Sequence, residues 1–545
     1  MSTSSFPLLH DDRNLCQVFF LRNLAKVRIV TNMETISGST RIIERVIRTR
    51  LPLATSLLSL LMGSLAFAGQ QESSRLLVRG GALASEIHLS GTQTLHGAAQ
   101  RLYMHVSRDF QFKVVAEGEL PEQDGFDGKI TWHMNGSGIP HSSSYSDRDL
   151  TRLVAYVQAG VWSCKGSPVQ IVSEHGNDLV IKCSDGKTTA NLTLDPTTRT
   201  AKTMSCWGPS GTESWTFGNY KNSHGILIPG SVQHESGETK DSVTVTQFDM
   251  PIGGEVVYSM PYVQTNGFSF DAKNSPNIEV KRLYGYIFVR PKLDGKDEGW
   301  WFLDTGAEVM VIDPEVARAH NMKVVGNDSV SGVVASVKTN FSKGVEFQLG
   351  PVTIKNSSYM ELDMKPFSEG LGIKLAGICG YDYIGRATLD IDPKKNTIGV
   401  YPSGTMTLPD STSWTPFLFH GNMPSLSCQF EGNHDGLFSL DTGSGSTVDF
   451  FSPAVTKYNL LKDREINTVM TGGAGGASES KTGTLDWFIV ANKRFQKPTV
   501  GFQITTKGGF ASPFVDGNIG MGFMSNFRMI LDYQKSRLAM IAAKG

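Results

Sequence analysis

The sequence has little of what marks a disulfide framework, a metal site or a nucleic-acid partner. Its 545 residues include only six cysteines. They form no Cys-x-x-Cys pair or His/Cys cluster at zinc spacing, so we expect neither a disulfide framework nor a metal site. Lys and Arg total 51 against 52 Asp and Glu, which leaves no basic excess for a nucleic acid. The glycine-rich stretch 443–446 lacks the Gly-Lys-Ser/Thr of a phosphate-binding loop, and we expect no cofactor.

Long apolar runs are also scarce, and only residues 51–68 approach the length of a membrane span. This run follows several arginines and ends in Ala66-Phe67-Ala68, a pattern typical of a secretory signal peptide. We therefore expect an exported protein, periplasmic or secreted, that is cleaved after Ala68 and keeps no integral membrane segment. Because 68 residues exceed the usual signal length, we expect translation to start at Met33, so that 1–68 is an upstream extension plus the signal peptide.

The next part of the chain, residues 76–260, has the pattern of short strands joined by turns. Asp185-Gly186 and Asp195-Pro196 separate apolar runs, as hairpin turns do. A helical segment over Asp147–Val157 interrupts the strands. This part is therefore predicted to be an antiparallel sheet with a helix against it, an α+β domain. Residues 261–280 are rich in Asn, Pro and Ser, which predicts a linker.

Beyond residue 280 the chain repeats itself. Trp301–Ala307 (WFLDTGA) is matched by Leu437–Ser444 (LFSLDTGS), and each Asp-Thr-Gly follows an apolar strand. A second glycine-bearing motif comes 76 residues after the first Asp and 79 residues after the second, at Gly380 and Gly520. Repetition at this spacing predicts two copies of one supersecondary unit, over 281–405 and 412–545.

Paired Asp-Thr-Gly loops have a specific chemistry. An apolar strand delivers each Asp, the Gly allows a sharp turn behind it, and the Thr hydroxyl can bond across to the partner loop. Two carboxylates brought within a few ångströms cannot both ionise, so the pair holds one proton. One carboxylate can then act as general base on a water while the other protonates the carbonyl or the leaving group.

These motifs make residues 285–541 resemble the tandem retropepsin-like aspartyl proteases of the bacterial secreted type, in which two retroviral-protease-like lobes are fused. The resemblance implies a mainly β fold with two β lobes and a bilobal cleft. It implies an aspartic endopeptidase in which Asp304 and Asp441 are catalytic and a peptide or protein is the substrate. Because both Asp lie on one chain, a monomer is expected.

The resemblance also implies roles for three further sets of residues. The supporting active-site loops are Thr305, Gly306, Ala307, Thr442, Gly443 and Ser444. The segments that thread behind these loops are Ile378, Cys379 and Gly380, and Asn518, Ile519 and Gly520, with Asn518 where the family has an apolar residue. The flaps, of unequal mobility, contain Ser331 and Gly332 in one case and Gly472, Gly473, Gly475 and Gly476 in the other.

The residue after each triplet predicts an asymmetric pair. Ser444 can offer a hydroxyl to the outer oxygen of Asp441, whereas Ala307 offers none to Asp304. Because hydrogen bonds favour the ionised carboxylate, we expect Asp304 to be the less acidic member. We also expect a pH optimum in the mildly acidic range, roughly pH 4–6.5.

The sequence is also compatible with a function of another class. Residues 76–260 weakly resemble sheet-and-helix domains of the periplasmic lipoprotein-carrier type. The alternative is therefore a catalytically silent periplasmic protein that binds or carries a peptide or a lipid. Cleavage of an unstructured protein that a statine-type inhibitor blocks would discriminate between the two functions.

Overall fold

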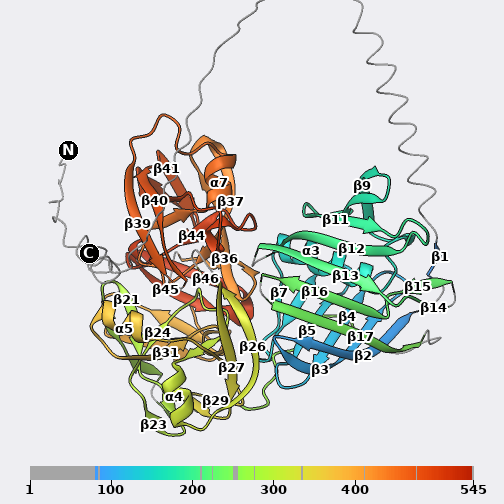
Figure 1. Ribbon diagram of the computed structural model, residues 1–545. Coiled ribbons are helices and arrows are strands. Elements are labelled where there is room, and N and C mark those ends of the chain that lie inside the picture. The colour runs from blue at the N-terminus through green and yellow to red at the C-terminus, as the bar shows by residue number, and fades with distance from the viewer. Residues whose placement is uncertain are drawn as a thin grey trace, which may run out of the picture. The chain divides into compact units, whose positions relative to one another are not determined.

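The structure is a computed structural model, and its fold is mainly β (Figure 1), which confirms the predicted fold class. The expected upstream extension, the Met33 start and the signal peptide with its cleavage site after Ala68 lie outside the described residues. In the part of the chain that is described, no helix is long and apolar enough to cross a membrane. The described residues are 80–83, 86–208, 211–223, 225–237, 239–249, 256–274, 276–332, 336–409, 412–473 and 475–542.

Residues 87–249 form one antiparallel sheet of 13 strands. Its order is β7 (His141–Ser142), β6 (Thr131–Met134), β5 (Glu122–Phe126), β4 (Phe112–Glu117), β3 (Ala98–Val106), β2 (Ile87–Leu95), β17 (Thr239–Asp249), β16 (Ser231–Ser236), β13 (Gly211–Gly218), β12 (Ala201–Gly208), β11 (Thr189–Leu194), β10 (Asp178–Cys183) and β9 (Val169–His175). Two short pairs lie beside it, β1 (Gly80–Ala82) with β8 (Cys164–Lys165) and β14 (Lys221–Ser223) with β15 (Ile226–Ile228). Side chains alternate between buried and more exposed along β3, as a sheet with one covered face requires.

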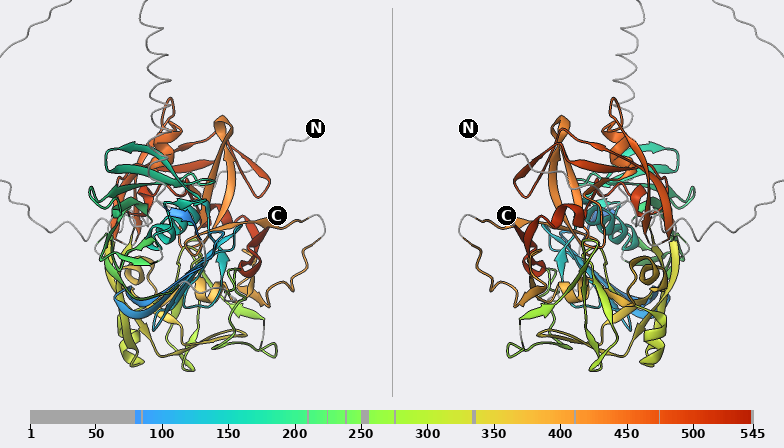
Figure 2. Two further views of the ribbon diagram at one scale, coloured as in Figure 1. Left: turned by 90° about the vertical axis from the view of Figure 1, so that its right-hand side faces the viewer. Right: turned by 90° about the vertical axis from the view of Figure 1, so that its left-hand side faces the viewer.

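The predicted helix and turns of this sheet are confirmed. Helix α3 (Tyr145–Gln158) contacts β6 and β10 and lies against the sheet in Figures 1 and 2. The Asp185-Gly186 turn joins β10 to β11, and the turn that begins at Asp195 joins β11 to β12. Asp195 Oδ1 accepts the N–H groups of Thr197 and Thr198, at 3.0 and 2.7 Å, which closes this turn.

Two further sheets share one strand order. The first is β20 (Lys281–Leu283), β21 (Tyr286–Val289), β24 (Trp300–Leu303), β31 (Leu375–Cys379), β25 (Met310–Ile312), β30 (Ser358–Glu361), β27 (Ser336–Lys343) and β26 (Lys323–Ser331). The second is β42 (Lys493–Gln496), β41 (Trp487–Val490), β36 (Met423–Phe430), β37 (His434–Leu440), β44 (Gly517–Ile519), β38 (Val448–Phe450), β43 (Thr499–Gln503), β40 (Gly476–Thr484) and β39 (Asn467–Gly473), with β35 (Leu418–His420) beside β36. In each sheet the strand that leads to an Asp runs parallel to one of its two neighbours: β24 is parallel to β31, and β37 is parallel to β44. The sequence repeat thus corresponds to a repeated strand order with an edge hairpin in each copy.

A six-stranded sheet joins the two copies. Its order is β19 (Asn277–Glu279), β33 (Thr397–Tyr401), β32 (Thr388–Ile391), β45 (Phe527–Asp532), β46 (Arg537–Ala542) and β34 (Thr415–Pro416). At its centre β32 pairs antiparallel with β45, and Asp390 faces Ile530. Asp390 is ten residues after Gly380 and Ile530 is ten residues after Gly520. The register therefore has the symmetry of a twofold axis between the copies.

The expected linker, 261–280, also contributes strands to two sheets. It contains β18 (Phe268–Phe270), which pairs with β29 (Val352–Lys355), and β19, which pairs with β33. The other strands of the β18 sheet are β28 (Glu346–Leu349), β22 (Lys292–Leu293) and β23 (Lys296–Asp297). Ile278 is buried in the main core and Phe268 packs against it. Turn residues dominate the composition of this stretch, so composition predicts a linker although a few buried apolar side chains hold the stretch against the core.

Short helices complete the fold. They are α4 (Pro314–Ala319), α5 (Lys365–Leu371), α6 (Tyr381–Ile384), α7 (Ser452–Lys457) and α8 (Met521–Met524), with 3-10 turns η1 (Glu431–Asn433), η2 (Gly509–Ala511) and η3 (Tyr533–Lys535). Asp313 caps α4, because its Oδ1 accepts the N–H of Glu315 at 2.8 Å. In α7, Ser452 lies inside the helix, and the cap position belongs to Phe451.

Polar contacts tie residues near β6 and β7 to the rest of the fold. Tyr381 Oη donates to the carbonyl of Ile139 at 3.0 Å, and the Arg386 guanidinium donates to the carbonyl of Ser137. The thiols in the described residues are buried and form no disulfide with one another; they are Cys164, Cys183, Cys206, Cys379 and Cys428.

One stability prediction concerns Asp532, which is fully buried at the end of β45. It accepts hydrogen bonds from Ser403 Oγ at 2.6 Å, from Gly404 N–H at 3.1 Å and from Arg537 at 3.2 Å. Asp532→Ala leaves these donors without a partner, so the free energy of unfolding should fall by about 3 kcal/mol. Chemical denaturation measures it. The matched control, Asp392→Ala in the first copy, removes a partly exposed carboxylate and should cost less than about 1 kcal/mol; equal losses would contradict the prediction.

Candidate active site

The two Asp-Thr-Gly loops meet where β24 and β37 end, so that each Asp is the first residue after its strand. The carboxyl groups of Asp304 and Asp441 face each other and interact directly. The N–H of Gly443 donates to Asp304 Oδ1 at 3.0 Å and to Asp441 Oδ1 at 2.9 Å. Gly306 N–H donates to Asp304 Oδ1 at 2.8 Å. The predicted pair of carboxylates is therefore assembled within one chain.

Thr305 and Thr442 fasten the loops to each other, as the sequence predicts. Thr305 Oγ1 donates to the carbonyl of Leu440 at 2.7 Å, and Thr442 Oγ1 donates to the carbonyl of Leu303 at 2.8 Å. Each hydroxyl also accepts the backbone N–H of the opposite Thr, at 2.9 and 3.0 Å. Both side chains are buried, so these four hydrogen bonds do not compete with water.

The glycines of the two triplets are needed for a reason that differs from the expected one. Neither Gly306 nor Gly443 has a positive φ. A Cβ on Gly306 would lie 2.6 Å from Asp441 Oδ1, and a Cβ on Gly443 would lie 2.4 Å from Asp304 Oδ2. Any side chain would therefore push the opposite carboxylate away. The close approach of the two loops, rather than a sharp turn, requires glycine.

The predicted threading segments hold the backbone of both loops by equivalent hydrogen bonds. The first set is Asp304 N–H to Cys379 O (3.0 Å) and Tyr381 N–H to Ala307 O (3.0 Å). The second is Asp441 N–H to Ile519 O (3.0 Å) and Met521 N–H to Ser444 O (2.7 Å). A Cβ on Gly380 would lie 2.2 Å from the carbonyl of Val309, and one on Gly520 would lie 2.5 Å from that of Ser446. Glycine is thus required where each segment passes its loop.

One expectation about the second loop is wrong, the hydrogen bond from the Ser444 hydroxyl to Asp441, and Asn518 makes a contact that the sequence did not predict. Asn518 lies where the family has an apolar residue. Its Nδ2 donates to Asp441 Oδ2 at 3.0 Å. The Ser444 hydroxyl does not reach Asp441 but pairs with Ser446 Oγ at 2.8 Å. The outer oxygen of Asp441 is thus bound by an amide from the threading segment, and the Ser444 hydroxyl is bound to Ser446.

The environment raises the pKa of both carboxyl groups. Burial and the facing Asp441 carboxylate raise the pKa of Asp304 to about 8, although N–H groups of Gly306 and Gly443 favour its ionised form. Burial also raises the pKa of Asp441, while the hydrogen bonds from Asn518 and Gly443 oppose that rise. A pair in this state retains a proton at neutral pH, which is what general acid–base chemistry on a water requires.

The first expected flap is the tip of the β26–β27 hairpin, where Ser331 pairs with Ser336. The carbonyl of Gly332 accepts the N–H of Gly509 at 3.0 Å, so this tip contacts a loop of the second copy. Residues 333–335, which follow Gly332 at this tip, lie outside the described residues. Lower in the hairpin, Asn327 N–H donates to the carbonyl of His96 in the N-terminal sheet at 2.7 Å.

The second expected flap is the tip of the β39–β40 hairpin. Despite its many glycines this run is paired as strand: Gly472 pairs with Ala477 and Gly473 pairs with Gly476. Gly475 and Gly476 have φ of 80° and 125°, a backbone that only glycine adopts without strain. In the described part of the chain, no hydrogen bond joins these four glycines to the dyad.

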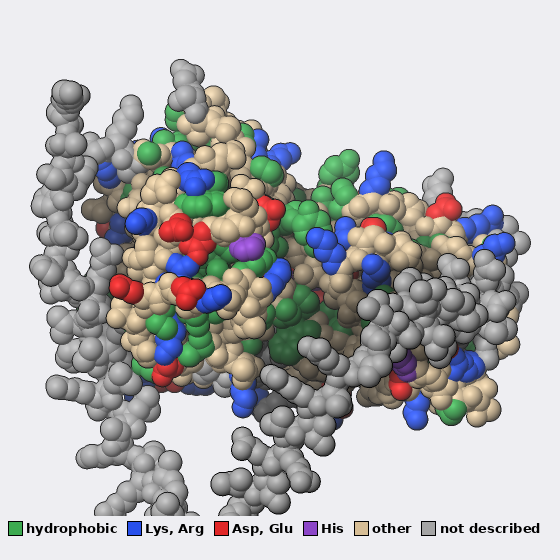
Figure 3. All heavy atoms as spheres, turned by 90° about the horizontal axis from the view of Figure 1, so that it is seen from above, with side chains coloured by type: hydrophobic (Ala, Val, Ile, Leu, Met, Phe, Trp, Pro, Cys, Tyr) green, Lys and Arg blue, Asp and Glu red, His purple; other side chains and the backbone are tan. Residues whose placement is uncertain are grey.

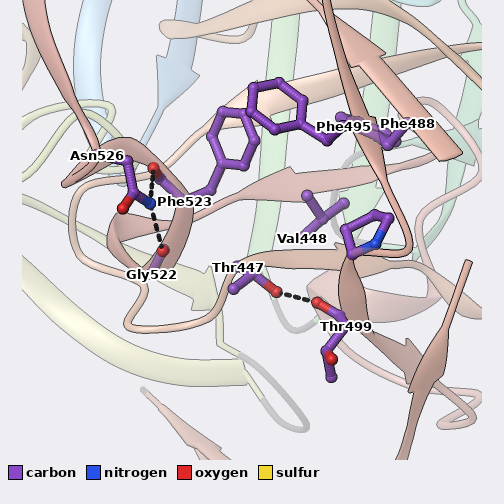
Figure 4. A pocket seen from close by; sticks show the side chains of 9 residues that line it. Thr447, Val448, Phe488, Phe495, Thr499, Gly522, Phe523 and Asn526 are labelled. Atoms are coloured by element: carbon purple, nitrogen blue, oxygen red, sulfur yellow. Dashed lines mark hydrogen bonds between the residues drawn. The ribbon is translucent and has the colours of Figure 1, made fainter. Parts of the chain in front are cut away.

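Other surface features do not point to a second kind of site. A pocket of about 370 Å³ lies behind the second loop (Figure 4), and none of the predicted site residues lines it. Aromatic side chains of Phe488, Phe495 and Phe523 form much of its wall. On the face seen in Figure 3, Lys and Arg are interspersed with Asp and Glu, without a patch of one sign. No group of three or more potential metal ligands occurs among the residues the structure describes.

Comparison with known families agrees with the geometry. Residues 289–383 match the sequence model of a family described as aspartyl protease. The matched range contains the first Asp-Thr-Gly and Gly380, and the second Asp-Thr-Gly lies outside it. The match supports a retropepsin-like aspartyl protease in general, with peptides as substrates. No curated protein matches the chain.

The raised pKa of Asp304 predicts how stability depends on pH. The pKa rises from an ordinary 3.8 to about 8 on folding, so ionisation of Asp304 opposes folding increasingly as the pH rises through this window. Asn cannot ionise, so Asp304→Asn should raise the melting temperature relative to wild type at pH 8 but not at pH 4. Scanning calorimetry at both values measures the effect. A difference in melting temperature that does not change with pH would contradict it.

Proposed function

We propose that the protein is an aspartic endopeptidase that hydrolyses peptide bonds with a water activated between Asp304 and Asp441. The observation that carries this proposal is the pair of facing carboxyl groups that share the N–H of Gly443 as a hydrogen-bond donor. The Thr305–Thr442 hydrogen bonds that hold the pair support it further. The aspartyl protease match over residues 289–383 supports the same class of reaction.

The pair can supply both proton transfers of the reaction. The ionised carboxylate removes a proton from water while the water oxygen attacks the peptide carbonyl, and the protonated carboxyl group donates its proton to the carbonyl oxygen. The tetrahedral intermediate then collapses when its C–N bond breaks. The proton taken from water passes to the leaving amine, and the proton on the former carbonyl oxygen returns, so the pair again holds one proton.

We further propose that residues 281–405 and 412–545 are two lobes of a tandem retropepsin-like protease of the bacterial secreted type. Support comes from the shared strand order of the two sheets and from the β32–β45 pairing between them. A dyad completed within one chain needs no second copy, so the proposed enzyme acts as a monomer. Export to the periplasm or medium is proposed from the signal-like sequence before Ala68. The alternative, a catalytically silent binding or carrier protein, does not account for two intact carboxyl groups that share one N–H donor.

The proposed function predicts that Asp304→Asn and Asp441→Asn each abolish turnover. A single carboxylate cannot serve as both acid and base, so the expected loss is roughly a thousandfold or more. Cleavage of an unstructured protein, with and without a statine-type inhibitor, measures it, and Asp392→Asn serves as the matched control. A mixture of the two single variants should also be inactive. Activity in the mixture would show that the site forms between chains, and full activity of either variant alone would end the proposal.

A second prediction concerns the β39–β40 hairpin as a flap. A Cβ added at Gly472 would have space, since the nearest atom would lie 3.8 Å away. Gly472→Ala should therefore leave the melting temperature unchanged while it slows turnover several-fold, because it stiffens a hairpin that must close over substrate. Gly475→Ala, at a φ of 80°, is the contrasting variant and should lower stability by about 1–2 kcal/mol. Unchanged turnover in Gly472→Ala would remove the flap assignment.

A further inference from the structure

The two copies differ in the layer behind the dyad. In the second copy, Asn518 on β44 lies between Ser439 of β37 and Asp449 of β38. The equivalent position of the first copy is Ile378 on β31, between Phe302 and Val311. A layer that is apolar in the first copy therefore contains an amide and a carboxyl group in the second.

This polar layer is buried. Asn518 and Asp449 each expose 5% of their surface and Gln503 exposes none. Asn518 Nδ2 donates to Asp441 Oδ2 at 3.0 Å, and Gln503 Nε2 donates to Asp449 Oδ1 at 3.4 Å. Burial of such groups costs free energy unless their hydrogen bonds repay it. The first copy shows that the same strand arrangement forms without them, so the fold itself does not require Asn518.

The hydrogen bonds to the two carboxyl groups are distributed unequally. Both backbone donors to Asp304, from Gly306 and Gly443, reach the same oxygen, Oδ1. Asp441 accepts at both oxygens, from Gly443 at Oδ1 and from Asn518 at Oδ2. A carboxyl group that accepts at both oxygens is best satisfied when ionised, whereas Asp304 keeps Oδ2 free of these donors and available to carry a proton.

We propose that Asn518 is a positioning residue that keeps Asp441 ionised as the water-activating member of the pair, so that the shared proton resides on Asp304. The catalytic part of this inference rests on the proposed function. Asn518 acts through Asp441 and need not touch the substrate. The first copy, with Ile378 at the equivalent place, offers Asp304 no such donor, and the two Asp residues therefore have different tasks although their loops are nearly identical.

The other groups around Asp441 do not reverse this assignment. Asp304 faces it across the pair, and Asp449 on β38 adds repulsion. Burial raises the pKa of Asp449. Tyr533, close enough to Asp304 to interact with it, is buried and its pKa is raised well above the usual value, so it stays neutral.

The test is the pH profile of kcat/KM for Asn518→Ile, which introduces the residue of the first copy. Loss of a hydrogen bond to a carboxylate should move the acidic limb upward by about one to two pH units, since protonation of Asp441 becomes easier. The basic limb should stay in place, because Asp441 is ionised on both sides of it. Gln503→Leu is the matched control. It removes a buried amide from the same layer that donates to Asp449 and not to the dyad, and both limbs should stay.

An acidic limb that stays in place in Asn518→Ile, or that moves equally in Gln503→Leu, would overturn the proposal and leave Asn518 a packing residue. If Asn518→Ile does not fold, Asn518→Ala removes the same donor without added bulk. Carboxyl-carbon NMR titration without substrate, assigned with Asp441→Asn, separates this inference from the proposed function. Asp441 must titrate at higher pH in Asn518→Ile than in wild type even if wild type cleaves nothing. Absence of cleavage alone would count against the function and not against Asn518.

Discussion

The hydrogen bonds exchanged by Thr305 and Thr442 are the constraint on which the rest of the site depends. Two carboxyl groups that lie against each other repel when both are ionised. The loops cannot relieve this repulsion by moving apart, because separation would break four buried hydrogen bonds between them. The remaining way to lower the energy is to retain a proton on the pair. The geometry of two neutral threonines thus fixes the protonation of two acids, which is the property that the proposed chemistry uses.

Close packing around the loops adds a second constraint. Gly306 and Gly443 admit no Cβ because the opposite carboxylates occupy that space, and Gly380 and Gly520 admit none because loop carbonyls do. The parallel pairing of β24 with β31 and of β37 with β44 brings these segments together. In each copy the shape of the loop is therefore fixed both by the segment that passes behind it and by the loop of the other copy. Such a loop has little freedom to move its Asp, as a preorganised site requires.

The parts of the site that the sequence predicts are local and repeated. The Asp residues, the threonines and the threading glycines stand in short motifs that occur twice, and repetition of a motif identifies both its members. Contacts that depend on one copy alone are not predictable in this way. From the sequence, Asn518 is only a departure from the apolar residue of the family. The structure shows that its amide donates to the carboxyl group of Asp441, 77 residues away. Ser444 was expected on Asp441, but Ser446, two residues along, binds its hydroxyl instead.

The strands within 261–280 illustrate the same limit for the fold. Phe268 and Phe270 pair with residues of β29 that lie more than eighty positions later in the chain, and Ile278 pairs in β33 with a residue 120 positions later. A prediction from local composition is dominated by the Asn, Pro and Ser residues around them. Their order comes from long-range pairing and from burial of a few apolar side chains, and neither is visible in composition.

The two edge hairpins share a place in the strand order but not their support. In β26, Asp328 accepts a hydrogen bond from Thr239 at 2.6 Å and contacts His96 at 2.5 Å, and both partners belong to the N-terminal sheet. His96 also contacts Glu122 at 3.1 Å, and although burial opposes it, these two acidic partners raise the pKa of His96. A protonated His96 between two carboxylates ties the first hairpin to that sheet by charge as well as by hydrogen bonds. The first hairpin can therefore move only if these contacts break, whereas the second ends in a glycine turn whose φ values set its shape. The two hairpins thus occupy the same place in the strand order but are held by different contacts.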